Sequence, residues 1–298
     1  MARVGIVSCD KWLGKLEEDI NLKNELINLG IDAHIISWQQ PLCESYDALI
    51  LRSVWGYQDH YNEFKEWLSY IENNGIILLN DFDLIKNNIN KEIQFSILKK
   101  NGIKVVDTYF ISKYMFNNSD FLDSFKDGHY VIKPSISGSG ENTFIINDAD
   151  NLKIKNTIKK SNVRKIYMPI LENNDECKIM IQPFIPEINN GEYSCIFING
   201  ILTHTMIRFP NIFHDKKRPY LLEDIPSSVI KLATEVSNIP EYRNYLYMRV
   251  DMVLSNGVAQ IMEVELADPD LLTKYIENID IKTRVIKTFA KKIERRIR

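Results

Sequence analysis

Residues 245–270 read YLYMRVDMVLSNGVAQIMEVELADPD and contain two apolar segments separated by Ser255-Asn256-Gly257. Apolar residues recur at alternate positions on both sides, which is typical of β-strands with one buried face. An Asn-Gly pair between two such segments is a strong signal for a tight turn. The stretch therefore predicts an antiparallel hairpin, and the other segments of the chain can be arranged around it.

The predicted hairpin carries charged residues in otherwise apolar strands: Arg249, Asp251, Glu263 and Glu265. Residues two apart on a strand project to the same face, so Glu263 and Glu265 share one face of their strand. Arg249 and Asp251 share a face of the neighbouring strand for the same reason. Whether the two pairs meet depends on the length of the loop that joins the strands.

Two loops are compatible with the sequence. A two-residue turn at Asn256-Gly257 would pair Asp251 with Met262 and place Glu263 on the opposite face. A three-residue loop with Gly257 in the left-handed region would pair Asp251 with Ile261, which puts Glu263 diagonally opposite on the same face. We predict the three-residue loop, because it gathers the charged residues on one side of the sheet.

Three carboxylates on one face are costly unless a cation neutralises them. Hard oxygen ligands suit Mg²⁺, and Mg²⁺ in proteins usually accompanies the phosphates of a substrate. The hairpin therefore predicts a metal site at Asp251, Glu263 and Glu265. The alternative is a solvated sheet face with alternating charges, and the hairpin alone leaves both interpretations open.

The composition is that of an ordinary globular protein, with 298 residues, 45% hydrophobic, 26% charged and a formal net charge of -3. That length suffices for two or three subdomains. No broad basic stripe and no long apolar run is present, so we expect neither a nucleic-acid partner nor a membrane. The four cysteines lie far apart without a CxxC pair, and we expect them to be reduced thiols of a cytoplasmic protein.

Residues 3–80 alternate strand-like and helix-like segments, which predicts a small parallel sheet covered by helices. No G-x-G-x-x-G turn follows the first strand, so a dinucleotide site is not expected. The segment RSVWGY follows the third strand and supplies Arg52, Ser53, Trp55 and Tyr57. Ligands bind beyond the carboxyl ends of such strands, so these residues are candidates for binding a carboxylate substrate. The alternative is that the aromatic residues pack against the next domain.

The strand HYVIKP contains Lys133 and runs into Ser135-Ile136-Ser137-Gly138-Ser139-Gly140. Glycines allow backbone N–H groups to approach oxygen atoms closely, and the lysine adds positive charge, so the loop is a candidate phosphate cradle. It is not a Walker A motif, because no Gly-Lys-Ser/Thr opens a helix. The alternative is a hairpin loop that binds nothing.

IMIQPFIPEI, residues 179–188, predicts a buried strand that leaves its sheet near two prolines, where free backbone groups would suit an adenine ring. A hairpin around Asn199-Gly200 follows and ends at Arg208. The loop after it contains Arg218. This loop is either solvated or forms a clamp that binds anions. The last segment, residues 271–298, is predicted to be helical and ends in basic residues.

In this order the segments resemble the ATP-grasp superfamily of carboxylate–amine ligases, and the resemblance covers nearly the whole chain. It implies an α/β (α+β) ATP-grasp fold, with a Rossmann-like α/β domain at residues 1–82. Two subdomains that hold ATP between their sheets would follow, at residues 83–183 and 184–298. RSVWGY and EVELADP look most like the group that contains glutathione-synthetase-like and D-cycloserine-forming ligases.

The resemblance also implies roles for individual residues. The two lysines and the Gly/Ser loop would contact the nucleotide together with the hinge strand, which gives the set Lys91, Lys133, Ser135, Ser137, Gly138, Ser139, Gly140, Gln182, Phe184, Ile185 and Glu192. Asp251, Glu263 and Glu265 would hold Mg²⁺, with Mn²⁺ as the alternative. Arg249 and Arg208 would stabilise the charge of an acyl phosphate and of the tetrahedral species that follows it.

Two departures from the family pattern concern the metal and the substrate. Glu265 stands where an Asn is usual, and HDKKRPY lacks the glycine pair of the glutathione synthetases. We expect an ATP- and Mg²⁺-dependent ligase that activates a small carboxylate for attack by an amine-type nucleophile. A carrier protein or peptide is the alternative partner, and we expect a monomer or homodimer. The rival hypotheses are a kinase or phosphotransferase, and an ATP-binding regulatory protein without turnover.

Overall fold

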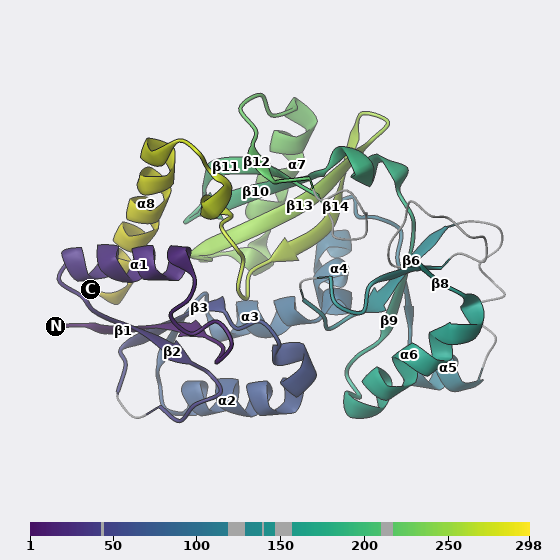
Figure 1. Cartoon of the computed structure of the whole chain (residues 1–298), viewed down its shortest axis with the longest axis horizontal. Coiled ribbons are helices and arrows are strands. Elements are labelled where there is room, and N and C mark those ends of the chain that lie inside the picture. The colour runs from purple at the N-terminus through teal and green to yellow at the C-terminus, as the bar shows by residue number, and fades with distance from the viewer. Residues whose placement is uncertain (43–44, 119–128, 139, 147–156, 210–216) are drawn as a thin grey trace.

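Three β-sheets organise the molecule, and the strands of each sheet come from one part of the chain (Figure 1). The computed structural model describes residues 1–298 except 43–44, 119–128, 139, 147–156 and 210–216. No helix among the described residues is long and apolar enough to cross a membrane.

The first sheet is parallel, has the strand order β2-β1-β3-β4, and confirms the predicted alternation of strands and helices. Every residue of β3 is buried, as expected for a central strand of a parallel sheet. Its elements are β1 (Arg3–Ser8), α1 (Glu17–Asn28), β2 (Asp32–Ser37), β3 (Ala48–Ser53), η1 (Tyr57–His60), α2 (Tyr61–Asn73) and β4 (Ile77–Leu79).

Two helices connect this sheet to the second one, α3 (Phe82–Ile89) and α4 (Lys91–Lys100). The second sheet has the order β5-β9-β6-β7-β8 and is antiparallel except between β7 and β8. Its elements are β5 (Tyr109–Ile111), α5 (Lys113–Asn118), β6 (Tyr130–Pro134), β7 (Phe144–Ile146), β8 (Thr157–Ile158), α6 (Lys160–Asn173) and β9 (Ile179–Pro183).

The third sheet is antiparallel throughout and has the order β12-β11-β10-β13-β14. Its elements are η3 (Pro186–Asn190), β10 (Glu192–Ile198), β11 (Ile201–Arg208), β12 (Tyr220–Leu221), α7 (Ser227–Ser237), η4 (Pro240–Tyr242), β13 (Tyr247–Ser255) and β14 (Val258–Glu265). The chain then passes through η5 (Thr273–Tyr275) into α8 (Ile279–Ile297), which packs beside α1 (Figure 1).

The hairpin of β13 and β14 brings the charged residues to one face by a different route from the predicted one. Asn256 and Gly257 both have positive φ, 51° and 77°, and Ser255 pairs with Val258, so the turn has two residues and the predicted three-residue loop is wrong. A bulge at Met262 shifts the register by one residue. Asp251 therefore lies directly opposite Glu263, and the predicted common face is correct.

Two other predicted elements are shorter than expected. The helix predicted for residues 271–298 begins at Ile279, because the side chain of Asn278 caps it by accepting hydrogen bonds from the N–H groups of Asp280 and Ile281. The apolar segment IKVVDTYFI, residues 103–111, predicts one strand, but only β5 (Tyr109–Ile111) forms it. Val105 instead forms an isolated bridge to Ile261 at the outer edge of β14.

Side-chain amides cover the rest of the β14 edge and replace a missing neighbouring strand. Gln94 accepts a hydrogen bond from the N–H of Val264 at 2.9 Å and donates one to its carbonyl at 2.7 Å. Asn88 accepts from the N–H of Leu266 at 2.8 Å and donates to the carbonyl of Val264 at 2.8 Å. Because an unpaired strand edge is otherwise free to shift, these bonds fix the strand that carries Glu263 and Glu265.

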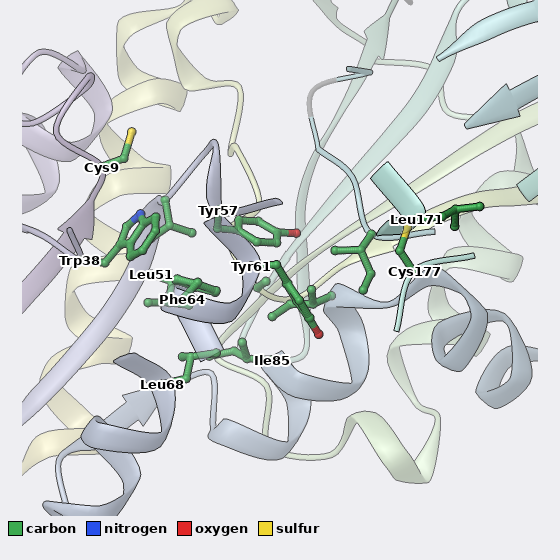
Figure 2. Close-up of a cluster of buried hydrophobic side chains, with 14 of the residues drawn as sticks. Cys9, Trp38, Leu51, Tyr57, Tyr61, Phe64, Leu68, Ile85, Leu171 and Cys177 are labelled. Atoms are coloured by element: carbon green, nitrogen blue, oxygen red, sulfur yellow. The ribbon is translucent and has the colours of Figure 1, made fainter. Parts of the chain in front are cut away.

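One apolar core joins the first sheet to the second. Aromatic side chains from the first-sheet region, including Trp38, Tyr57 and Phe64, lie on one side of this core, and Leu171 and Cys177 lie on the other (Figure 2). The Phe64 ring stacks on Tyr57 with a centroid distance of 5.0 Å. Continuous apolar packing of this kind holds the segment after β3 in a fixed position relative to the second sheet.

Candidate active site

A cavity of about 730 Å³ collects most of the residues that the sequence singled out. It is bordered by the second sheet, by the third sheet and by the segment that follows β3. The predicted residues that line it are Trp55, Tyr57, Lys91, Lys133, Ser137, Gly138, Gly140, Gln182, Phe184, Ile185, Glu192, Arg208, Arg218, Arg249, Glu263 and Glu265. Residues predicted separately to bind nucleotide, metal and substrate thus share one space.

Four of the predicted residues that the structure describes do not line this cavity. Ser135 and Asp251 are fully buried behind its wall, and Arg52 and Ser53 lie in the first sheet away from it. Ser139 lies outside the described residues.

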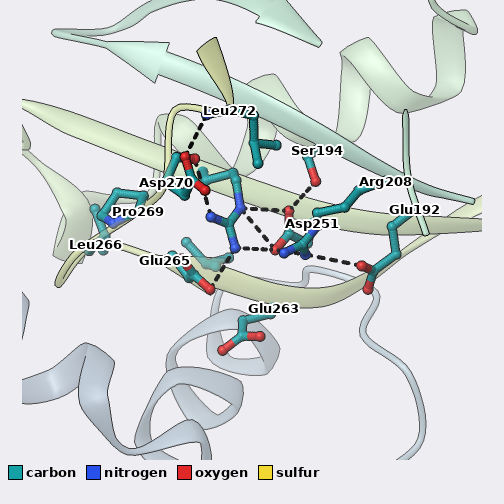
Figure 3. Close-up of polar contacts among 12 residues, drawn as sticks. Glu192, Ser194, Arg208, Asp251, Glu263, Glu265, Leu266, Pro269, Asp270 and Leu272 are labelled. Carbon is teal, nitrogen blue, oxygen red and sulfur yellow. Dashed lines mark hydrogen bonds and ion pairs between the residues drawn. The ribbon is translucent and has the colours of Figure 1, made fainter. Parts of the chain in front are cut away.

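Arg249 on β13 is the centre of the polar network (Figure 3), and only 3% of its side chain is exposed. Its Nε lies 3.0 Å from Oδ1 of Asp251, and its second terminal nitrogen lies 2.6 Å from Oε1 of Glu265. A further bond of 3.2 Å runs to the carbonyl of Asp270. The guanidinium is therefore locked in place between two carboxylates and the loop that follows β14.

Both carboxylate oxygens of Asp251 accept hydrogen bonds. Its oxygens accept hydrogen bonds from Ser194 at 2.7 Å and Arg208 at 2.7 Å as well as from Arg249. Burial alone would raise the pKa of Asp251, but the guanidinium groups of Arg208 and Arg249 hold that pKa below its ordinary value. Asp251 is therefore a carboxylate that orients the two arginines.

Two lysines approach the acidic strand from the opposite wall. Nζ of Lys91 lies 3.0 Å from Oε1 of Glu263 and donates to the carbonyl of Ser137 at 2.6 Å. Burial lowers the pKa of Lys133, and the nearby Glu263 opposes that effect. Burial would raise the pKa of Glu263, but the two ammonium groups outweigh it and lower that pKa. Lysine charge thus faces carboxylate charge across the space where a phosphate chain would fit.

Glu192 lies beside Arg208 at 3.0 Å, and burial raises its pKa despite this partner. At the hinge strand, Gln182 donates from its side chain to Oγ1 of Thr108 at 2.8 Å. The N–H of Phe184 donates to the carbonyl of His129 at 2.8 Å, so this backbone group is already paired. Any backbone group that this segment offers to an adenine ring is therefore not the N–H of Phe184.

A metal ion fits the acidic face. One carboxylate oxygen from each of Asp251, Glu263 and Glu265 lies within 4.8 Å of the other two. The side chains of Glu263 and Glu265 are 25% and 26% exposed and line the cavity, whereas Asp251 is fully buried. Burial, reinforced by the neighbouring carboxylates, raises the pKa of Glu265 to about 7. Glu263 and Glu265 are thus the accessible oxygen donors, and Mg²⁺ is the cation that such hard ligands suit.

Comparisons with known proteins identify the fold of the chain. Residues 4–80 match the family model described as D-cycloserine synthetase DcsG, N-terminal domain. A search of curated proteins finds no match. The crystal structure of D-cycloserine synthetase DcsG is similar over 100% of both chains, with a TM-score of 0.79 and 16% identity. The chain has the ATP-grasp fold.

Two further solved structures with the ATP-grasp fold match nearly the full length. D-alanine–D-alanine ligase from Bacillus anthracis, complexed with ATP, has a TM-score of 0.64 and 18% identity, covering 99% of this chain and 96% of that one. The structure of the ATP-grasp ligase PsnB, complexed with minimal precursor, Mg and ADP, has a TM-score of 0.59 and 14% identity. The match covers 97% of this chain and 96% of PsnB.

Arg52 has a different place in the fold from the predicted one. It forms an ion pair with Glu18, lies 3.6 Å from Asp19 and donates to the carbonyl of Pro269 at 2.7 Å. Ser53 donates to Asp19 at 2.8 Å. The prediction that Arg52 and Ser53 face the substrate is corrected, because both side chains are used to hold α1 and the loop after β14 against the first sheet.

The sequence analysis missed the acidic residues of that loop. Asp268 and Asp270 both line the cavity, as do Lys274 and Tyr275. The signal for Asp268 is an acid between Ala267 and Pro269 in a segment that is otherwise buried. The segment EVELADP resembles one group of ATP-grasp ligases, but that resemblance assigns no role to its Asp.

Proposed function

We propose that the protein is an ATP- and Mg²⁺-dependent ligase that activates a small carboxylate as an acyl phosphate and joins it to an amine or a similar nucleophile. The observation that carries this proposal is the charge pattern of the cavity. Lys91 and Lys133 face the carboxylates of Glu263 and Glu265 across one space, so groups that bind phosphate lie opposite groups that bind a divalent cation. Related structures hold ATP, or Mg and ADP, in the same fold.

In this proposal Lys91 exchanges its ion pair with Glu263 for the phosphates of ATP, and Lys133, whose charge acts on the same carboxylate, also binds the phosphates. Glu263 and Glu265 would hold Mg²⁺ or Mn²⁺, which neutralises phosphate charge and acts as a Lewis acid. Arg249 and Arg208 lie at the cavity wall with fixed guanidinium groups, and they stabilise negative charge that develops on the transferred phosphoryl group and on the oxygen of the tetrahedral intermediate. Asp251 keeps both arginines oriented.

The chemistry has two steps. An oxygen of the substrate carboxylate attacks the γ-phosphorus, the bond to ADP breaks, and an acyl phosphate forms. A nitrogen nucleophile then attacks the acyl carbon, the bond to phosphate breaks, and the amine proton is lost to solvent or phosphate. No covalent bond to the protein is required, so positioning and charge neutralisation provide the catalysis.

The proposal extends to the organisation of the chain and to its partners. Residues 1–82 form one domain, and residues 83–183 and 184–298 form the two subdomains that enclose the nucleotide. The substrates are a small carboxylate and an amine-type nucleophile, with a peptide or carrier protein as the alternative partner. We place the enzyme in the cytoplasm, where free cysteines such as Cys9, Cys177 and Cys195 stay reduced.

A screen of amino acids and small carboxylates for ADP release, followed by mass analysis of the products, tests the proposal. We expect one pair of substrates to give ADP, phosphate and a condensed product. Lys133→Ala is the matched variant, and it should lose ADP release with every pair. A stable phosphorylated product without condensation would support a kinase instead. Binding of ATP without ADP release for any pair would support a regulatory protein.

A further inference from the structure

Asp268 is a buried acid at the cavity that the proposed mechanism does not use. The residue is 9% exposed, and it lies on the loop between β14 and α8. Its Oδ2 is buried and has no hydrogen-bond partner in the described structure. Because an unpaired buried carboxylate lowers the stability of a fold, its presence beside an open cavity calls for a ligand that pairs with it.

The next acid on the same loop shows the contrast. Asp270 also lines the cavity, but its Oδ1 accepts a hydrogen bond from the N–H of Leu272 at 2.8 Å and its Oδ2 lies 3.2 Å from Nζ of Lys274. Asp270 therefore stabilises the turn that leads into η5. Asp268 makes no such bond, so loop formation does not account for it.

The cations near Asp268 already have other partners. Arg249 is bonded to Asp251 and Glu265, and Arg52 is bonded to Glu18 and the carbonyl of Pro269. The acidic groups that face Asp268 are Glu265 and Glu263, which add to its negative charge. This end of the cavity thus has an excess of negative charge and attracts a cation.

The side chains that line the cavity with Asp268 favour an organic ammonium group over a second metal ion. Trp55, Tyr57 and Tyr275 line the cavity together with Asp268, and aromatic faces bind ammonium groups favourably. The cluster of described residues whose carboxylates converge as metal ligands consists of Asp251, Glu263 and Glu265 and does not include Asp268.

The loop is held firmly enough to act as a receptor. The carbonyls of Pro269 and Asp270 accept hydrogen bonds from Arg52 at 2.7 Å and Arg249 at 3.2 Å. Glu18 accepts bonds from the N–H groups of Leu271 and Thr273 at 3.2 Å and 3.1 Å. A binding group on a fixed loop loses little entropy when its ligand arrives.

We infer that Asp268 receives the protonated amino group of a small amino-acid-type substrate and thereby determines the substrate specificity of this cavity. The inference rests on the proposed function, since it assigns the substrate class of the same site. The carboxylate end of such a substrate points toward the arginines and the γ-phosphate, and the amino group lies between Asp268 and the aromatic side chains.

Calorimetric titration of the full chain with amino acids in both configurations, each paired with its N-acetyl derivative, tests this inference. Titrations are carried out with and without Mg²⁺ and the non-hydrolysable ATP analogue AMPPNP. For wild type, at least one free amino acid should bind about 10-fold or more tightly than its N-acetyl derivative. Asp268→Asn should remove this difference, while Asp268→Glu, which keeps the charge, should retain part of it.

Asp280→Asn is the matched control, because it makes the same change at an exposed position on α8 away from the cavity, and it should retain the full discrimination. The inference is overturned if wild type binds no amino acid better than its N-acetyl derivative, or if Asp268→Asn keeps the discrimination. It is also overturned if Asp268→Asn weakens Mg-AMPPNP itself, since Asp268 would then belong to the metal site. Absence of AMPPNP binding to wild type would instead refute the proposed ligase function, and titrations without nucleotide would still test Asp268.

Discussion

Arg52 and Arg249 have nearly identical surroundings and different places in the molecule. Each is 2% exposed, each pairs with two acidic residues, and each donates to a carbonyl of the loop after β14. Arg249 nevertheless lines the cavity and touches the acidic face, whereas Arg52 does not line the cavity and lies over the Tyr247 ring, 5.2 Å from its centroid. A buried arginine with two acid partners is therefore not by itself a catalytic group, and its access to the cavity decides its role.

The largest expected effect comes from changing each arginine to lysine. Arg249→Lys should lower ADP release per folded molecule by roughly 10²–10³-fold, because a lysine cannot reproduce the fixed guanidinium at the acyl phosphate. Arg52→Lys should lower the free energy of unfolding by roughly 1–3 kcal/mol through lost hydrogen bonds, with little effect on activity per folded molecule. Urea unfolding and kinetic assays measure stability and activity for both variants. Equal losses of activity in the two variants would contradict the different roles of Arg249 and Arg52.

The common face of the hairpin could be predicted from the sequence, but the way it forms could not. Alternation placed Glu263 and Glu265 together, and Asn-Gly located the turn. The bulge at Met262 was missed, because it depends on how β14 meets Val105 and the amides of Asn88 and Gln94 from distant segments. Turn length alone therefore predicted the wrong loop.

The same limit explains the errors at Arg52 and Asp268. The pairing of Arg52 is decided by Glu18 on α1 and by a loop more than 200 residues away in sequence. The unpaired state of Asp268 is a property of the folded cavity, and no local pattern encodes it. Residue types at strand ends indicate which sheet edges border the site. Partners from distant elements decide which side chains reach the cavity.

The second prediction separates the two accessible acids on the strand. Glu263→Ala removes an oxygen donor and leaves Lys91 without its carboxylate partner, so ADP release should be lost at every Mg²⁺ concentration. Glu265→Asn keeps an oxygen donor and removes one charge beside Arg249, so turnover should persist with a changed dependence on Mg²⁺. ADP release measured against Mg²⁺ concentration tests both variants. An Asn variant whose curve overlays that of wild type would exclude Glu265 from the metal site.

The third prediction concerns pH. The pKa of Glu265 is about 7 in the fold and 4.5 as its ordinary value, so the folded state keeps the proton longer than the unfolded state. The associated stability is present below pH 4.5 and is lost as the pH rises through 7, by roughly 3 kcal/mol in the metal-free protein. In Glu265→Gln this part of the pH dependence of the free energy of unfolding should be absent. Urea unfolding of both proteins from pH 4 to pH 8 measures it, and parallel curves would contradict the assignment.

The smallest expected effect is the stabilisation of the ligand-free protein by Asp268→Asn. Burial raises the pKa of Asp268, so the acid destabilises the fold increasingly as the pH rises above its ordinary value of 3.8. An uncharged amide of the same size should raise the free energy of unfolding at pH 7 by about 1 kcal/mol, with no gain at pH 3. Thermal unfolding at the two pH values checks this, and an unchanged stability at pH 7 would indicate that Asp268 has a partner in solution.

The most direct test of the ligase proposal follows an oxygen atom. The carboxylate substrate found in the ADP-release screen is labelled with ¹⁸O and incubated with the protein, MgATP and the nucleophile. If the carboxylate attacks the γ-phosphorus and phosphate then leaves the acyl carbon, one ¹⁸O atom per turnover should appear in the released phosphate. Phosphate without ¹⁸O, formed together with ADP, would show that no acyl phosphate forms and would contradict the proposed function.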